Sequence, residues 1–270
     1  MIRLPDRHYF TLRRLHSLSG LVPIGVFLAE HFLTNSFAVA GEHAYNSKVE
    51  FLRSLPYLYL LEIFGIFLPI LFHAALGVLI YLEARFNSRA LPYRHNFMFT
   101  LQRITGLFLL VYIGYHVMST RFAHWFGINN RNLFELMEHK LQNPAIFGFY
   151  VLGVLAASFH LGNGLWGFAL HWGILRSREA QRRWMWPAMA VVAIFALAGV
   201  NSLLAFGPMG LEPVRFFQEA GPHQEATVEE RAPEETLPEL TARSTSEPAA
   251  ETETTDREPD AETAEETHHE

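Results

Sequence analysis

The segment "AIFGFYVLGVLAASFHLGNGLWGFAL", residues 145–170, contains no Asp, Glu, Lys or Arg. A helix rises about 1.5 Å per residue, so this segment is long enough to cross the roughly 30 Å hydrocarbon core of a bilayer. Its polar residues include His160, followed by an asparagine and three glycines. The segment predicts a transmembrane helix. His160 is a candidate functional residue, because polar side chains are costly in lipid.

Four other apolar runs have the length of a membrane span, and the segments between them carry the Pro, Asn, Gly and charged residues typical of loops. We therefore predict an all-α integral membrane protein. Its transmembrane domain, residues 1–206, is expected to have five helices, the first four forming a bundle. The expected spans are about residues 17–39, 57–82, 99–120, 145–170 and 185–206.

Residues 207–270 differ sharply in composition from the rest of the chain. They hold 18 acidic and 4 basic residues, a net charge of −14, whereas residues 1–206 carry +8. They are rich in Glu, Thr, Pro and Ala, with no Phe, Trp or Tyr after Phe217. Such a segment buries too little apolar surface to offset its conformational entropy, so we expect an acidic, disordered tail.

The basic residues indicate how the chain is oriented. The N-terminal segment and the second and fourth loops carry 11 Lys and Arg residues, against five in the first and third loops. The positive-inside rule therefore predicts a multi-pass protein of the inner or cytoplasmic membrane, with a cytoplasmic N-terminus and the tail outside. An alternative is a cleaved signal peptide ending at "AVA", residues 38–40. That run is long for a signal core and contains Glu30 and His31, so we favour a retained helix.

Each of the first four predicted helices carries one histidine well inside the membrane: His31, His73, His116 and His160. The helices alternate in direction. Counting the helical rise therefore puts His31 and His116 near the outer face, and His73 and His160 near the inner face. Two imidazoles at one depth on facing helices can hold a haem iron from both sides. We predict two such haems b and one-electron transfer, because no axial position is left for oxygen.

Alternative roles for these four histidines stay open. A lone intramembrane histidine is more often a packing residue, and a set of them can relay protons in a transporter. A zinc or di-iron site usually includes carboxylates at one depth, and few occur here beyond Glu30 and Glu62. The chain has no cysteine to supply a thiolate. Glycines near the histidines suit either a flat cofactor or close helix packing; they are Gly25, Gly77, Gly162, Gly164 and Gly167.

The histidine-containing segments resemble a known family. The similar stretches are "RRLHSLSGLVPIGVFLAEH" (13–31), "SLPYLYLLEIFGIFLPILFH" (54–73), "LQRITGLFLLVYIGYHV" (101–117) and "GFYVLGVLAASFHLGNGLWGFALHWGI" (148–174). They look like the diheme cytochrome b membrane anchor of succinate:quinone oxidoreductase (respiratory complex II), of the five-helix, single-anchor type. The resemblance covers about residues 8–206. The tail departs from the family pattern, and its role stays open.

The resemblance implies a non-catalytic subunit of succinate dehydrogenase. A flavoprotein subunit and an iron–sulfur subunit would be its partners, besides membrane lipid, and no nucleic-acid partner is expected. His73 and His160 would hold the proximal haem, next to the iron–sulfur subunit, and His31 and His116 the distal haem. Electrons would then pass to a quinone, with menaquinone expected. The anchor of a quinol:fumarate reductase, running in reverse, stays an alternative, and formate dehydrogenase and hydrogenase anchors match less well.

Two further sets of polar residues are predicted to serve these ligands. Haem propionates need basic or hydrogen-bonding groups near the cytoplasmic ends of the first and third spans; the candidates are Arg103, His16 and Ser17, with Arg14 and Gln102. In this family the quinone is thought to bind near the distal haem. The candidates there are Glu42, His43, Asn46, Glu50 and Arg121. The simpler alternative for each is an interfacial or solvated side chain.

Overall fold

The computed structural model describes residues 6–83, 94–127 and 131–215. Within these ranges the chain is helical, with five helices long and apolar enough to cross a membrane, which confirms the predicted fold class. These helices are Phe10–Ala40, Leu58–Glu83, Asn96–Phe122, Pro144–His171 and Arg178–Leu204. Residues 216–270, which make up most of the predicted acidic tail, lie outside the described residues, as do Arg3, Arg85 and Arg89 of the basic segments.

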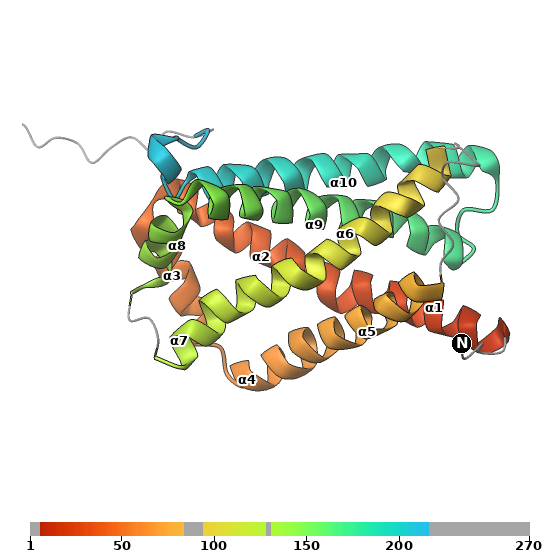
Figure 1. The fold of residues 1–270 in the computed structure, drawn as a ribbon, viewed down its shortest axis with the longest axis horizontal. Coiled ribbons are helices and arrows are strands. Elements are labelled where there is room, and N and C mark those ends of the chain that lie inside the picture. Colours follow the sequence, from red (N-terminus) through yellow and green to blue (C-terminus); the bar gives the residue numbers. More distant parts are fainter. Residues whose placement is uncertain (1–5, 84–93, 128–130, 216–270) are drawn as a thin grey trace, which may run out of the picture. The chain divides into compact units, whose positions relative to one another are not determined.

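Short helices lie between the first and second spans and between the third and fourth (Figure 1). In chain order the elements are α1 (Asp6–Ser19), η1 (Gly20–Gly25), α2 (Val26–Ser36), η2 (Phe37–Ala40), α3 (Glu42–Arg53), α4 (Leu58–Leu60), η3 (Leu61–Phe67), α5 (Leu68–Glu83), α6 (Arg94–Val117), η4 (Met118–Phe122), α7 (Ala123–Trp125), α8 (Leu133–Leu141), α9 (Pro144–His171), α10 (Arg178–Leu204) and η5 (Pro208–Gly210). Three of them, η1, η3 and η4, are π-helical segments within spans. The other two, η2 and η5, are 3₁₀ turns.

The first and last spans begin earlier than the apolar runs predict. The last one starts at Arg178 rather than near residue 185, and the first is helical from Asp6 rather than from about residue 17. A hydropathy count finds only the part of a helix that lies in hydrocarbon, whereas the helix itself continues among the headgroups.

Side-chain caps explain where the later helices begin. The Asn143 side chain accepts hydrogen bonds from the amides of Ala145 and Ile146, with Pro144 at the first helical position of α9. Ser177 caps α10 in the same way, by accepting from the amide of Ala180. Both arrangements satisfy backbone N–H groups that have no partner within the helix.

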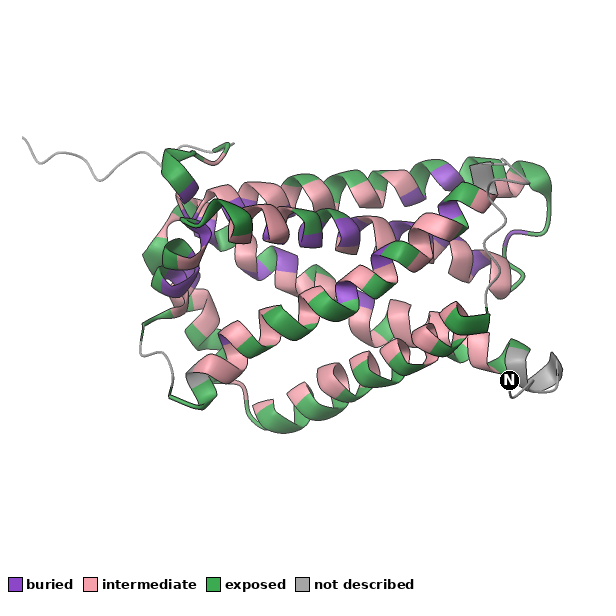
Figure 2. Cartoon of the chain, viewed as in Figure 1, coloured by how far each residue is buried: buried purple, intermediate pink, exposed green. Residues whose placement is uncertain are grey.

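The packing is uneven around the bundle. Helix α9 packs against both α10 and α6, and α1 packs against α5. One apolar cluster, which includes Phe32, Tyr150 and Phe206, lies toward the α3–α8 end, and a second, which includes Trp166 and Met185, lies toward the opposite end. By contrast, the helix formed by α4, η3 and α5 has no buried residue (Figure 2). Its inner side faces a cavity rather than a packed core.

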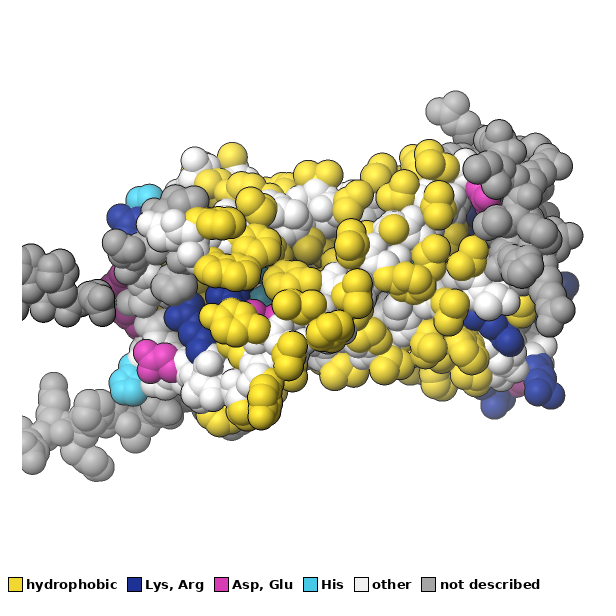
Figure 3. Space-filling model, turned by 90° about the horizontal axis from the view of Figure 1, so that it is seen from below, with side chains coloured by type: hydrophobic (Ala, Val, Ile, Leu, Met, Phe, Trp, Pro, Cys, Tyr) yellow, Lys and Arg dark blue, Asp and Glu magenta, His cyan; other side chains and the backbone are white. Residues whose placement is uncertain are grey.

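The outer surface of the spans is apolar, as a lipid-facing surface must be. Figure 3 shows one face of the molecule covered mainly by hydrophobic side chains, with Lys and Arg side chains gathered toward the two ends of the described region. Large apolar residues are exposed on every span, among them Val26, Leu71, Val111, Leu152 and Leu197. The chain is therefore a multi-pass membrane protein.

Candidate functional site

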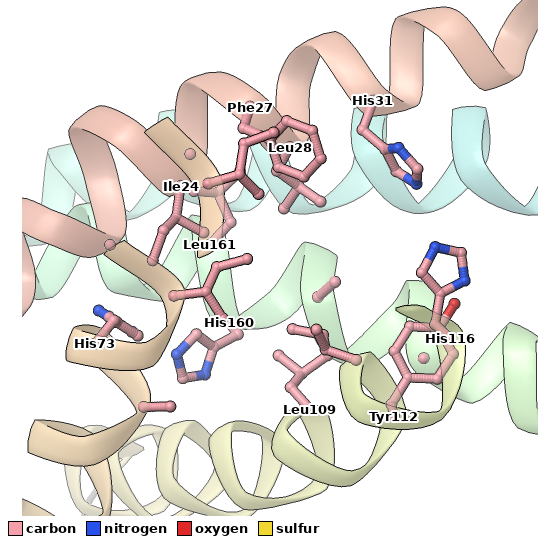
Figure 4. Close-up of a pocket in the computed structure, with 18 of the residues that line it drawn as sticks. Ile24, Phe27, Leu28, His31, His73, Leu109, Tyr112, His116, His160 and Leu161 are labelled. Carbon is pink, nitrogen blue, oxygen red and sulfur yellow. The ribbon is translucent and has the colours of Figure 1, made fainter. Parts of the chain in front are cut away.

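The four intramembrane histidines form two pairs, each joining two different helices (Figure 4). The ring centres of His31 on α2 and His116 on α6 are 5.7 Å apart, and the ring planes are 81° apart. The corresponding values for His73 on α5 and His160 on α9 are 6.2 Å and 83°. In the figure the two pairs lie on opposite sides of a group of apolar side chains. They are the same two pairs that the sequence predicts from the number of helical residues between each histidine and the start of its span.

The geometry of both pairs suits an iron bound from two sides. Metal–imidazole bonds are about 2 Å long, so two imidazoles on opposite sides of one metal have ring centres about 6 Å apart. All four rings line one cavity of about 990 Å³, at the upper end of the roughly 300–1,000 Å³ usual for ligand sites. Among the described residues, no group of three or more His, Cys, Asp or Glu is placed to hold a metal ion. Two imidazoles at this separation fit a haem iron held from both sides.

Hydrogen bonds fix the tautomer of the His73–His160 pair. Nδ1 of His73 lies 3.0 Å from the backbone oxygen of His16, which can only accept, so Nδ1 donates. The Thr105 hydroxyl donates to the carbonyl of Leu101 at 2.9 Å and therefore accepts from Nδ1 of His160 at 3.2 Å. In the neutral form of both rings, Nε2 keeps its lone pair, which is the form that binds a metal.

Further contacts hold the same pair in place. The ring of His16 stacks on that of His73, with centres 3.9 Å apart and 14° between the planes. The side chain of Gln102 donates to the backbone oxygen of His160 at 3.0 Å and accepts from Asn163 at 2.8 Å. The pair is thus tied to α1, α6 and its own helix α9, which limits movement of the two rings.

The surroundings of the His31–His116 pair are more aromatic. The ring of Tyr112 stacks on that of His116 at 5.9 Å, and Nδ1 of His116 is buried without a hydrogen-bond partner. One turn further along the chain, the backbone oxygen of Ser119 accepts from Lys140 at 2.5 Å. Burial lowers the pKa of Lys140 to about 8. A titratable cation therefore lies close to this pair at the α8 end of the bundle.

Two glycines make room for histidine rings. A Cβ built on Gly20 would lie 2.5 Å from Cε1 of His73, and one on Gly106 would lie 2.9 Å from Cε1 of His160. Gly162 has another role, because its Cβ would collide with α10, which makes it a helix-packing glycine. The remaining glycines near the predicted ligands line the cavity: Gly25, Gly77, Gly164 and Gly167.

The predicted propionate residues separate into two groups. His16, Ser17, Gln102 and Arg103 line the cavity near the His73–His160 pair. Arg14 is not among the lining residues, and its Nε instead donates to a backbone carbonyl of α9 at 3.2 Å. Ser17 donates to the backbone oxygen of Arg14 at 2.9 Å and accepts from Trp172 at 3.3 Å, and the amide of Gln102 is engaged with α9.

The predicted quinone residues also separate. Arg121 lines the cavity and forms a bidentate ion pair with Glu62, with 2.9 Å from Nε to Oε1 and 2.8 Å from Nη2 to Oε2. The cavity side of α3 is formed by Tyr45, Val49, Leu52 and Arg53. The other four candidates also lie on α3 but are absent from the cavity lining: Glu42, His43, Asn46 and Glu50.

Sequence analysis did not identify Thr105, Ser19 or the pairing of Glu62 as parts of the site. Their partners are 54 to 59 residues away along the chain. The only signal was polarity, because each is a polar residue within or beside an apolar run. Polarity alone does not identify the partner on another helix.

Comparison with known proteins finds a relative of high identity. The chain is 42% identical over 197 residues to a Bacillus subtilis (strain 168) protein named succinate dehydrogenase cytochrome b558 subunit. The match covers 73% of this chain and 96% of that protein. No family model matches the chain.

Proposed function

The chain belongs to the family of succinate dehydrogenase cytochrome b subunits, and on this basis we propose that it carries two haems b and passes electrons from succinate to a membrane quinone. It is accordingly a membrane-anchor subunit of succinate dehydrogenase. The two-haem proposal rests on the two pairs of facing histidine rings, His31 with His116 and His73 with His160. Both have the ring separation that one iron requires, and both lie in one cavity.

In this proposal each histidine pair would hold one haem iron, and the hydrogen bonds at Nδ1 leave Nε2 of His73 and His160 for that role. Bound there, the haems would carry single electrons across the membrane. The chain's own residues orient and enclose them: Thr105 and the backbone of His16 keep Nδ1 protonated at His160 and His73. His16, Ser17 and Arg103 face the cavity where propionates would need hydrogen bonds or positive charge.

The proposed orientation follows the positive-inside rule. The N-terminus and the basic second and fourth loops face the cytoplasm, where the flavoprotein and iron–sulfur subunits dock. The His73–His160 pair then becomes the proximal site, and the His31–His116 pair lies near the outer face. The acidic tail is outside.

The quinone is proposed to bind near the His31–His116 pair. Of the residues expected to contact it, Arg121 faces the cavity, whereas Glu42, His43, Asn46 and Glu50 do not and carry no part of the proposal. Menaquinone is the expected acceptor, and succinate oxidation the expected direction.

The test is spectroscopic and uses the assembled complex. We expect succinate to reduce two b-type haems, with His73→Ala and His160→Ala losing one of them and His31→Ala and His116→Ala losing the other. His139→Ala, at an exposed position on α8, is the control and should keep both. The proposal fails if the purified complex contains no porphyrin, or if the His160 and His116 variants lose the same haem.

A further inference from the structure

A bidentate ion pair joins two spans at the α4–α7 end of the cavity. Arg121 contributes Nε and Nη2, and Glu62 both carboxylate oxygens, and the Tyr59 side chain also hydrogen-bonds to the guanidinium. Both side chains line the cavity that contains the histidine pairs, and Arg121 follows His116 by five residues in α6–η4. The pair is therefore at the same end as the His31–His116 pair.

Both partners lie in π-helical turns. Glu62 is in η3 and Arg121 in η4, so two neighbouring spans are widened where their charged side chains meet. A π turn shifts the side chains that follow it around the helix axis and exposes backbone groups, and such turns are frequent at functional sites. Pro69, just after η3, cannot donate to the carbonyl of Gly65 inside η3, so a proline accounts for the widening of that span; η4 has no proline in it or in the turn that follows.

The ion pair is also partly exposed. The Arg121 side chain is 29% exposed and that of Glu62 is 16% exposed, although both belong to membrane spans. Around them, exposed apolar residues cover the outer surface, including Phe64 at 64% and Trp125 at 57%. Figure 3 shows acidic and basic side chains within the hydrophobic face near its left end. A charged pair beside lipid is costly, so a role in binding a ligand that needs polar groups is favoured over packing alone.

The flanking aromatics suit a flat ring. Phe67, which lines the cavity, stacks on Phe122 with centres 5.8 Å apart and 16° between the planes. Phe122 in turn stacks on Trp125 at 5.7 Å, and the Arg121 guanidinium lies 5.7 Å from the same Trp125 ring. Aromatic faces and a cation beside them form a surface on which an aromatic ligand with carbonyl oxygens can stack and hydrogen-bond.

We propose that Glu62 and Arg121 form the polar anchor of the quinone headgroup, which enters from the lipid between α5 and α6. This rests on the proposed quinone reduction and deepens it by assigning the binding residues. Arg121 donates to a quinone carbonyl oxygen, and Glu62 holds the guanidinium in the required orientation. The guanidinium also favours the electron-rich oxygen of the reduced ring. Glu62 is thus a positioning residue, and Arg121 contacts the substrate.

The test measures quinone binding separately from electron entry. In the purified complex we expect Arg121→Gln to raise KM for 2,3-dimethyl-1,4-naphthoquinone at least tenfold, with succinate reducing the haems as in the wild type. Arg121→Lys keeps the positive charge but loses the planar, bidentate guanidinium, so a KM between those of the wild type and Arg121→Gln is expected. Glu62→Gln should raise KM less than Arg121→Gln. The matched control is Glu138→Gln, the same change at an exposed position of α8, and it should leave KM unchanged.

A second measurement does not depend on turnover. A photoreactive azido-naphthoquinone should label peptides covering residues 58–67 or 118–125, and Arg121→Gln should reduce that label at least tenfold. Wild-type KM in both Arg121→Lys and Glu62→Gln, or labelling concentrated on residues 42–53, overturns the anchor. The anchor is also overturned if the Arg121→Gln complex loses haem while Arg121→Lys keeps a wild-type KM. In that case the ion pair stabilises the packing of two helices and does not bind the quinone. If succinate does not reduce the wild-type haems, the proposed function itself fails.

Discussion

Replacing Gly20 by alanine is expected to weaken haem binding at the His73–His160 pair. A Cβ at Gly20 would lie 2.5 Å from Cε1 of His73, whereas carbon atoms in contact are about 3.5–4.0 Å apart. The His73 ring or the π-helical turn η1 must therefore move by about 1 Å. Metal–ligand distances vary by only about 0.2 Å, so the site cannot absorb this movement without losing bond energy.

The size of the effect follows from overpacking. Extra methyl groups in a packed interior cost about 1–3 kcal/mol. Because about 1.4 kcal/mol corresponds to a factor of ten, haem affinity at this pair should fall about 5- to 150-fold. Gly106→Ala should weaken the same haem to a smaller extent, since its Cβ would lie 2.9 Å from Cε1 of His160.

The assay is haem per polypeptide by pyridine haemochrome, together with the reduced-minus-oxidised spectrum of the purified complex. Gly20→Ala should lose one b-type band and keep that of the His31–His116 pair. Gly148→Ala on α9 is the control: a Cβ there meets nothing within 4 Å, and both haems should stay. Two full haems in Gly20→Ala, or loss of the other one, would refute the steric reasoning.

Two other predictions follow from the hydrogen bonds. Thr105→Val removes the acceptor for Nδ1 of His160, so the haem affinity of the His73–His160 pair should fall about 10- to 100-fold in a haem titration. Thr105→Ser keeps the hydroxyl and should bind haem as the wild type does. Equal haem affinity in the wild type and both variants would contradict the role given to the hydroxyl. Burial lowers the pKa of Lys140 to about 8, so this side chain loses its proton as the pH rises through that value. Its rate of acetylation, measured by mass spectrometry, should therefore level off above about pH 8 and not near pH 10.5. A rate still rising steeply at pH 10 would show that Lys140 is not desolvated as the structure has it.

The long apolar helices and the pairing of the four histidines could be predicted from the sequence alone. Both depend on local properties: a run of apolar residues partitions into lipid wherever it occurs, and the helical rise is constant. Counting from the ends of four runs was therefore enough to bring His31 level with His116 and His73 level with His160. The helix starts at Asp6 and Arg178 lie before these runs, because helices extend beyond the hydrocarbon.

Which polar groups meet was settled by the folded arrangement of the helices. The spans are apolar around most of their circumference, so their sequences do not indicate how each helix is rotated about its axis. That rotation puts Thr105 against His160, Glu62 against Arg121 and Gly20 against His73. It also turns Glu42 and Glu50 of α3 away from the cavity. Contacts between helices depend on lateral packing and on π-helical turns, and neither is encoded in the length or hydropathy of a single run.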